Sequence, residues 1–291
     1  MIRKFRFTKA CMEQVAEFYR NLTLPPAAKP KKEPPAPPVT RLTDEEAYTR
    51  EELSRVLTAS RTDVGKVRAI NQDALLEGTD YYGVADGMGG HQGGEVASAL
   101  ARDSLGALLA GKTPDGTVLR EAVVELNQII HRKAEETETL EGMGTTITVL
   151  WMGEKEAILA HVGDSRAYLY RKGHLIQMTE DHSLVADLVR EGLITPSQAA
   201  THPLRNVVTR SVGTEENLQV DVMHHDRQQG DVWLICSDGL HGLVSFEELR
   251  EAMEIKPLEK AADELLRRAL QAGGRDNISL LLLRDGRGPL D

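Results

Sequence analysis

From about residue 60 onward, short apolar runs of strand length alternate with longer segments that have helical periodicity. The runs are rich in β-branched or aromatic residues, and short turns such as Arg171-Lys-Gly173 join several of them, which predicts antiparallel neighbours. Strands are expected at residues 81–85, 145–151, 157–162, 167–170, 218–222, 232–236 and 278–283.

Helices are expected both early and late in this region. Apolar residues recur at helical spacing over residues 97–108 and 119–130. Two later helices are predicted to begin at the Ser245–Glu248 capping box and at Pro257, the second ending at Gly273-Gly274. Because helices follow the early strands and precede the last one, the pattern favours an α+β fold in which helices cover sheet layers on both sides. The 291 residues suffice for one such domain and an appendage.

The first 59 residues differ in composition from the rest. Residues 25–38 contain seven of the twelve prolines, which predicts an extended linker over residues 25–41. Before it, residues 1–24 place apolar, aromatic and basic residues at helical spacing and predict an amphipathic segment that docks on a partner protein or an anionic membrane surface. A tail without structure is the alternative. After the linker, the Thr43–Glu46 capping box predicts a short helix within residues 42–59, ending near Leu57.

Charge is segregated along the chain. Residues 1–41 hold nine Lys or Arg against three Asp or Glu, a net charge of +6, so the total of −10 leaves −16 for residues 42–291. A region with this much negative charge repels nucleic acid and favours the binding of cations. No apolar run has membrane-spanning length, which predicts a soluble protein, and two cysteines far apart in unlike contexts favour a reducing compartment, the cytoplasm. A monomeric catalytic domain is also expected.

Four segments place an aspartate where an apolar strand meets a turn: Asn71-Gln-Asp73, Asp86-Gly-Met-Gly-Gly90, Ser237-Asp-Gly239 and Arg275-Asp-Asn277. One Asp-Gly alone indicates only a turn, but four beside apolar strands suggest a single convergent site. Two carboxylates about 4 Å apart repel by roughly 4 kcal/mol at an effective dielectric of 20, so such a cluster requires a cation. Oxygen ligands without cysteine favour Mg²⁺ or Mn²⁺ over zinc.

These motifs carry a resemblance when they are taken in order with two others. The order is Arg68-x-x-Asn71-Gln-Asp73, Asp86-Gly-Met-Gly-Gly, Met143-Gly-Thr-Thr146, His161-Val-Gly-Asp-Ser-Arg166, Ser237-Asp-Gly239 and Arg275-Asp-Asn277. From about Ser60 to Arg284 the chain resembles the bacterial branch of the PPM (type 2C) metal-dependent protein phosphatases. The resemblance implies a domain over residues 60–286 that is an α-β-β-α sandwich, two central, mostly antiparallel sheets flanked by helices. It also implies hydrolysis of phosphoserine and phosphothreonine by a metal-activated water, opposing a serine/threonine kinase.

The resemblance further implies which residues hold two Mn²⁺ or Mg²⁺ ions. Asp86 would bridge the two ions, and the carbonyl of Gly87 would complete one coordination shell. Asp238 and Asp276 would bind the second ion, while Asp73 would bind it or orient its waters.

Other implied roles lie outside this core. Asp164 would hold a weaker third cation, and Arg68 would grip the substrate phosphate, with a planar fork suited to its oxygens. Relatives outside bacteria often carry histidine where this chain has Met88, so the general acid stays open between a metal-bound water, His91 and His182. Residues 183–213 occupy the place of the family's flap, or form a packed helical insertion.

Three other interpretations fit the sequence less well. A silent phosphoprotein-binding pseudophosphatase would normally lack Asp86, Asp238 or Asp276, and the chain has all three. The P-loop pattern at residues 106–113 lies within and at the end of a helical repeat, which is the wrong context for nucleotide binding. Cys236 lacks the arginine six residues later that a cysteine phosphatase requires and is expected to be a buried strand thiol.

Overall fold

The structure, a computed structural model, describes residues 42–49, 55–89 and 93–286. Chain contacts separate residues 182–209 from the other described residues, which we call the body.

The body contains two antiparallel sheets. The first has the order β1-β11-β10-β7-β8, and the second has the order β2-β3-β5-β6-β9, with β4 paired to the end of β3. The strands are β1 (Leu57–Asp63), β2 (Asp73–Glu77), β3 (Tyr81–Met88), β4 (Gly144–Thr145), β5 (Ile147–Met152), β6 (Glu156–Val162), β7 (Arg166–Arg171), β8 (His174–Gln177), β9 (Asp221–Asp226), β10 (Val232–Cys236) and β11 (Ile278–Arg284).

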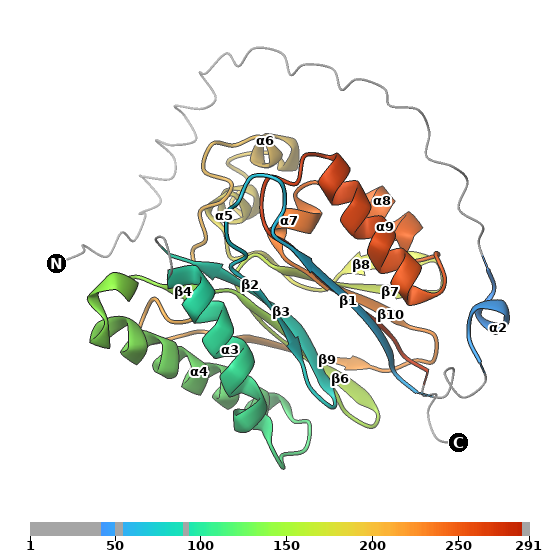
Figure 1. Cartoon of the computed structure of the whole chain (residues 1–291), viewed down its shortest axis with the longest axis horizontal. Coiled ribbons are helices and arrows are strands. Elements are labelled where there is room, and N and C mark those ends of the chain that lie inside the picture. The colour runs from blue at the N-terminus through green and yellow to red at the C-terminus, as the bar shows by residue number, and fades with distance from the viewer. Residues whose placement is uncertain (1–41, 50–54, 90–92, 287–291) are drawn as a thin grey trace. The chain divides into compact units, whose positions relative to one another are not determined.

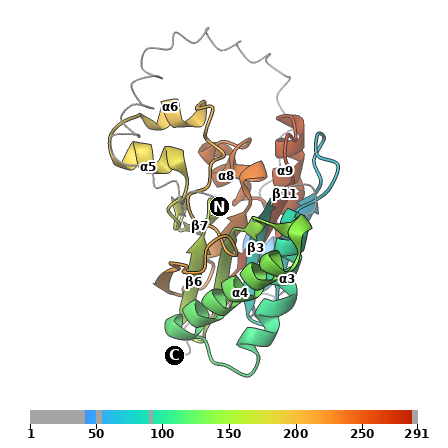
Figure 2. The ribbon, with the colours of Figure 1, turned by 90° about the vertical axis from the view of Figure 1, so that its left-hand side faces the viewer.

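Helices cover the outer face of each sheet (Figure 1). The long helices α3 (Gly93–Leu109) and α4 (Gly116–Glu136) pack side by side on the second sheet, as Figure 2 also shows. The first sheet is covered by α7 (Asp238–His241), α8 (Phe246–Ala252) and α9 (Leu258–Gln271). The α-β-β-α sandwich is therefore confirmed.

The inner strands are buried on both faces because each lies between a helix layer and the other sheet. Along β5, Val149 faces the cluster under α3 and α4, whereas Leu150 faces the cluster between the sheets. From the first sheet, Trp233 and Leu281 enter that same inter-sheet cluster. Alternate residues of one strand thus belong to different cores, which accounts for its continuous apolar sequence.

The N-terminal helix prediction was partly wrong. The Thr43–Glu46 capping box is present, but the helix α2 (Asp44–Ala47) has one turn, and Leu57 begins β1 instead of ending a helix. Asp44 contacts Lys256 at 2.5 Å and Arg284 at 2.6 Å, and the Arg284 guanidinium lies 5.4 Å from the ring centre of Tyr48. The helix is therefore held by the body through tertiary contacts, since one turn has little stability of its own.

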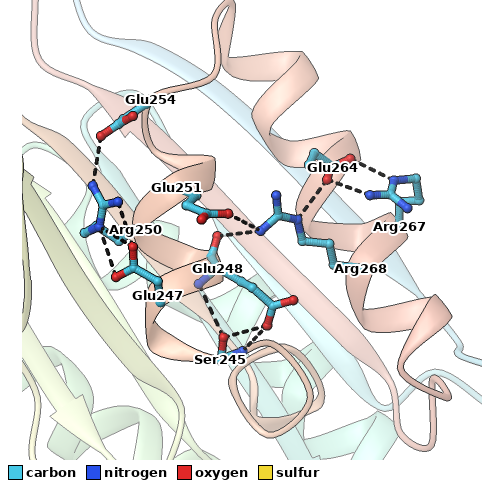
Figure 3. A network of polar contacts seen from close by, with 9 residues as sticks. All are labelled: Ser245, Glu247, Glu248, Arg250, Glu251, Glu254, Glu264, Arg267 and Arg268. Atoms are coloured by element: carbon cyan, nitrogen blue, oxygen red, sulfur yellow. Dashed lines mark hydrogen bonds and ion pairs between the residues drawn. The ribbon is translucent and has the colours of Figure 1, made fainter. Parts of the chain in front are cut away.

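Charged side chains join the last two helices (Figure 3). Arg268 of α9 donates to Glu264 on its own helix at 2.8 Å and to the Glu248 carbonyl of α8 at 3.0 Å. The predicted Ser245–Glu248 capping box begins α8, and α9 ends before Gly273 and Gly274, both with positive φ. These contacts fix the helix that leads into the loop before β11.

Residues 182–209 contain α5 (Leu184–Arg190) and α6 (Pro196–Ala200), capped by Ser183 and Thr195. Leu184, Val185, Leu188 and Ile194 form a small core of their own. The segment is thus a packed helical unit, and residues 210–213, expected to belong to it, belong to the body, where Val212 bridges to Thr145. In the described part of the chain, no helix has the length and apolarity needed to cross a bilayer.

Candidate active site

Asp73 and Asp86 lie directly opposite each other on the neighbouring strands β2 and β3. Opposite residues in an antiparallel pair point to the same face, with Cβ atoms roughly 4.5–5.5 Å apart. Thr146 Oγ1 accepts a hydrogen bond of 2.9 Å from the Asp86 N–H, and the Thr146 N–H donates to the Asp86 carbonyl at 2.8 Å. Asp86 was expected at a strand end and instead lies inside β3, which continues to Met88 because β4 pairs with it.

Asp238 reaches the same region from the other sheet. It begins α7 directly after β10, and the preceding Ser237 donates its hydroxyl to Asp73 Oδ2 at 2.8 Å. A Cβ at Gly239 would lie 1.8 Å from the carbonyl oxygen of Asn277, so only glycine lets α7 approach the loop before β11 so closely. This approach brings Asp238 towards Asp276 in that loop.

Asn277 fixes the loop between β1 and β2. Its Nδ2 donates to the carbonyls of Val64 at 3.0 Å and Ile70 at 2.9 Å, and its Oδ1 accepts from the Gln72 N–H at 2.8 Å. One side chain thereby holds both ends of the loop that carries Arg68. Figure 1 shows this loop beside the one before β11.

Arg68 contacts the acidic cluster directly. Its Nη2 lies 2.8 Å from Asp276 Oδ2, and 49% of the Arg68 side chain is exposed. This hydrogen bond, together with the charges of Asp276, Asp238 and Asp86, raises the pKa of Arg68. The predicted phosphate-binding residue therefore lies beside the predicted metal ligands, with about half of its side chain exposed.

Asp164, at the turn between β6 and β7, joins the site through α7. The ring of His241 donates from Nε2 to the Asp164 carbonyl at 3.0 Å. The neighbouring Arg166 donates to both carboxylate oxygens of Asp181, at 2.7 and 2.8 Å, and thereby supports this hairpin. The Asp164 side chain is buried.

The carboxylates have strongly perturbed acidities. Burial, followed by the charges of neighbouring aspartates, raises the pKa of Asp73 to about 6 and that of Asp238 to about 8. The same causes raise the pKa of Asp86 well above its ordinary value, and burial together with Asp181 raises that of Asp164 to about 6. The site thus holds more negative charge than its surroundings neutralise.

The donor set fits hard divalent cations, because it consists of carboxylate oxygens with neither cysteine nor histidine among them. As the side chains stand, no three Asp, Glu, His or Cys of the described residues converge on one ion position. Asp276, for instance, faces Arg68. The mutual effects on pKa nevertheless show that the carboxylates share one field, and side-chain rotation from these fixed backbone positions changes where their oxygens lie.

Gly87 is required by packing as well as by its expected role. A Cβ there would lie 2.0 Å from the Gly94 carbonyl oxygen, and the Gly87 N–H donates to the Gln72 carbonyl at 3.0 Å. The body thus brings together the predicted residues Arg68, Asp73, Asp86, Gly87, Asp164, Asp238 and Asp276. Sequence reasoning gave no role to Ser237 or Asn277, although both stand beside a predicted ligand.

The alternative motifs do not form sites. Gly106 lies inside α3 and Gly111 follows its end with φ +70, so the P-loop pattern lacks its strand and helix context. Cys236 is a buried strand thiol whose pKa burial raises to about 12. Of the general-acid candidates, His91 lies outside the described residues, and His182 belongs to the separate unit at residues 182–209.

Two stacked antiparallel sheets between helix layers, with aspartates from both sheets meeting beside an arginine, define the class of metal-dependent phosphatases that the motifs predict. The family model "Protein phosphatase 2C" matches residues 65–282, and the chain belongs to this family. The predicted family is confirmed.

Two curated relatives are each 40% identical to the chain. The first is the serine/threonine protein phosphatase PstP of Mycobacterium tuberculosis, similar over 227 residues that cover 77% of this chain but 44% of the relative. The second is the serine/threonine phosphatase stp of Listeria monocytogenes, similar over 236 residues that cover 77% of this chain and 93% of the relative. The chain thus spans less than half of the mycobacterial relative and nearly all of the listerial one.

Solved structures agree in fold. The catalytic domain of PstP in complex with two manganese ions is 38% identical, with a TM-score of 0.73 over 79% of this chain and 97% of that chain. The structure of Stp1 from Staphylococcus aureus is 32% identical, with a TM-score of 0.75, and the match covers 79% of this chain and 95% of that chain.

Proposed function

We propose that this chain is a metal-dependent protein phosphatase that hydrolyses phosphoserine and phosphothreonine in proteins. The observation that carries the proposal is the meeting of four aspartates of raised pKa, Asp73, Asp86, Asp164 and Asp238, beside Arg68 in a chain of this family. Relatives named serine/threonine phosphatases support the reaction type.

In this proposal the site residues divide two tasks. Asp86, Asp238, Asp276 and the Gly87 carbonyl would hold two divalent ions, and Asp73 would bind or orient water beside them. When bound, the ions neutralise phosphoryl charge and lower the pKa of an attacking water. Arg68, whose side chain is half-exposed, would bind phosphate oxygens, and its contact with Asp276 holds it beside the proposed ligands. Ser237 and Asn277 hold these residues in place.

The proposal includes the identity and the number of the ions. Manganese is supported by the relative's complex with two manganese ions, and magnesium suits the same oxygen donors. Asp164, linked to α7 through its carbonyl, would hold a weaker third ion. Replacing it with alanine should then slow turnover and leave two tightly bound ions, which counting bound manganese would test.

The binding-only alternative is less well supported. A pseudophosphatase of this type would normally lack one of the central ligands, whereas Asp86, Asp238 and Asp276 are all present. No relative named above carries a binding-only name.

Partners and location follow from the proposed reaction. Phosphorylated proteins are the substrates, and a serine/threonine kinase acts in opposition. Residues 1–24, which lie outside the described residues, would dock the enzyme on a partner or an anionic membrane, tethered by residues 25–41. Cytoplasmic placement and a monomeric catalytic domain stay predictions.

The experiment is hydrolysis of a phosphothreonine peptide with manganese, with and without a chelator. Phosphate release that requires manganese supports the proposal, and binding of the peptide without any release favours the pseudophosphatase. A rate unaffected by complete removal of metal would contradict a metal-dependent mechanism.

A further inference from the structure

The loop between β1 and β2 exposes an unusual amount of apolar surface around Arg68. Within the described residues, six large apolar side chains are markedly exposed, and three of them, Val64, Val67 and Ile70, lie in this one loop. Val67 is 69% exposed and Ile70 41%. Single exposed apolar residues are ordinary, but a cluster in one short segment marks a binding surface.

The loop is held in one conformation, so this surface is formed before anything binds. Asn277 holds the carbonyls of Val64 and Ile70, the Lys66 N–H donates to the Gly274 carbonyl at 2.7 Å, and the Gly65 N–H donates to Asp63 at 2.7 Å. Gly65 has φ +78, and a Cβ there would lie 2.2 Å from the Asp276 carbonyl oxygen. A preformed apolar surface loses little conformational entropy on binding.

Resting on the proposed function, we infer that Val67 and Ile70 determine specificity by contacting apolar side chains next to the phosphorylated residue of a protein substrate. Val67 precedes Arg68 and Ile70 follows it by two positions. Residues of an extended peptide are about 3.3 Å apart along the chain. A phosphate bound at Arg68 therefore brings the residues one or two positions away over Val67 and Ile70.

Basic side chains near this loop are a second possible source of substrate selectivity, beside its apolar side chains. Lys66 and Arg275 are exposed on this loop and its neighbour and would favour acidic flanking residues. Exposed ion pairs contribute little and are screened by salt, whereas burial of two apolar side chains is not screened. Apolar flanking residues are therefore the preference inferred at physiological ionic strength.

The test compares three phosphothreonine peptides of equal length, flanked on both sides by leucine, glycine or glutamate, in saturating manganese. For the wild-type protein, kcat/KM is expected to be about fivefold higher for the leucine-flanked than for the glycine-flanked peptide. The double variant Val67→Thr/Ile70→Thr keeps a β-branched side chain at both positions but makes each one smaller in apolar area and more polar. It should reduce this ratio to about one, with the glycine-flanked rate unchanged. The matched control is Ile176→Thr, at a residue 52% exposed on β8, and it should keep the wild-type ratio.

Several results would overturn the inference while leaving the phosphatase proposal intact. These are equal wild-type rates on leucine and glycine peptides, a preference for glutamate, or full selectivity in a folded double variant. Self-association of the wild type that the double variant abolishes, with selectivity unchanged, would assign the surface to a second copy of the chain. Failure of the wild type to hydrolyse any peptide would instead refute the proposed function itself.

Discussion

The hydroxyl of Ser237 donates a hydrogen bond of 2.8 Å to Oδ2 of Asp73, joining the end of β10 in one sheet to the start of β2 in the other. The same Ser237 Oγ accepts the Ser279 N–H at 3.0 Å. Since groups that orient metal ligands affect affinity strongly, Ser237→Ala should weaken manganese binding by about tenfold or more and reduce kcat to a similar extent.

Calorimetric titration with manganese checks this prediction, with Ser98→Ala as the control. Ser98 is equally buried but bonds only to the Glu95 carbonyl of its own helix among its described contacts. Unchanged manganese affinity in a folded Ser237→Ala variant would show that the contact does not position Asp73.

How far the sequence predicts this fold depends on where a strand lies in its sheet. Most inner strands match their predicted ranges closely, as with β10 at Val232–Cys236, because both faces are buried and the sequence is apolar throughout. The inner strand β3 is an exception, since it continues past its predicted end at Ala85 to Met88, where β4 pairs with it. The strands that were missed or displaced are all at sheet edges: β1, β2, β8 and, predicted at 218–222 but found at 221–226, β9. An edge strand such as β8 buries one residue of four, so its sequence carries a weak signal.

Prediction of the site from the sequence has a similar limit. The aspartates proposed as ligands could be singled out because they recur in recognisable motifs, whereas the contacts around them depend on tertiary structure. Nothing in the sequence indicates that Asn277 reaches Val64, 213 residues away, or that Arg68 pairs with Asp276.

Asn277 provides a second prediction. Asn277→Asp keeps the oxygen that accepts from Gln72 but removes the amide that donates to Val64 and Ile70. Two carbonyls then lose their partner, and we expect a loss of about 2–3 kcal/mol in the free energy of unfolding. Urea denaturation measures the loss, and trypsin should cleave faster at Lys66 and Arg68. Equal stability and equal cleavage would show that the loop is held by its other contacts.

The third prediction concerns pH. The pKa of Asp238 is raised to about 8, so without metal the folded state retains a proton that the unfolded chain, with the ordinary carboxyl pKa, has released. This stabilisation is complete below pH 4 and is lost as pH rises through about 8. Asp238→Asn removes the titration, so in a chelator its stability relative to wild type should increase between pH 5 and pH 8, by about 1–3 kcal/mol.

Thermal or urea unfolding at both pH values measures that difference. Asp263→Asn, at an exposed ion pair with Arg61, is the control and should show no such trend. If the wild type instead became more stable relative to Asp238→Asn between pH 5 and pH 8, the raised pKa of Asp238 would be contradicted.

The fourth prediction separates the N-terminal segment from the body. A chain starting at Leu42 keeps the contacts of Asp44 with Arg284 and Lys256, and should match the full chain in stability and in peptide hydrolysis. A chain starting at Arg55 lacks Asp44 and leaves Arg284, 5% exposed, without that partner, which should cost about 2–4 kcal/mol. Thermal denaturation compares the two, and equal stability would rule out an anchoring role for α2.

The same truncation tests docking. The chain starting at Leu42 should lose co-sedimentation with anionic vesicles or capture of a partner that the full chain shows. Retained binding would place the docking surface elsewhere.

The most direct measurement is manganese titration and phosphothreonine-peptide hydrolysis in the wild type, Asp238→Asn and Asp276→Asn. Each amide keeps the shape of the carboxylate but removes the charge proposed to hold the second ion. The wild type should bind two ions tightly and release phosphate, whereas each variant should fold, lose one tight ion and retain less than about 1% of kcat. A folded variant that binds both ions, or works within a few-fold of the wild-type rate, would contradict the two-ion site.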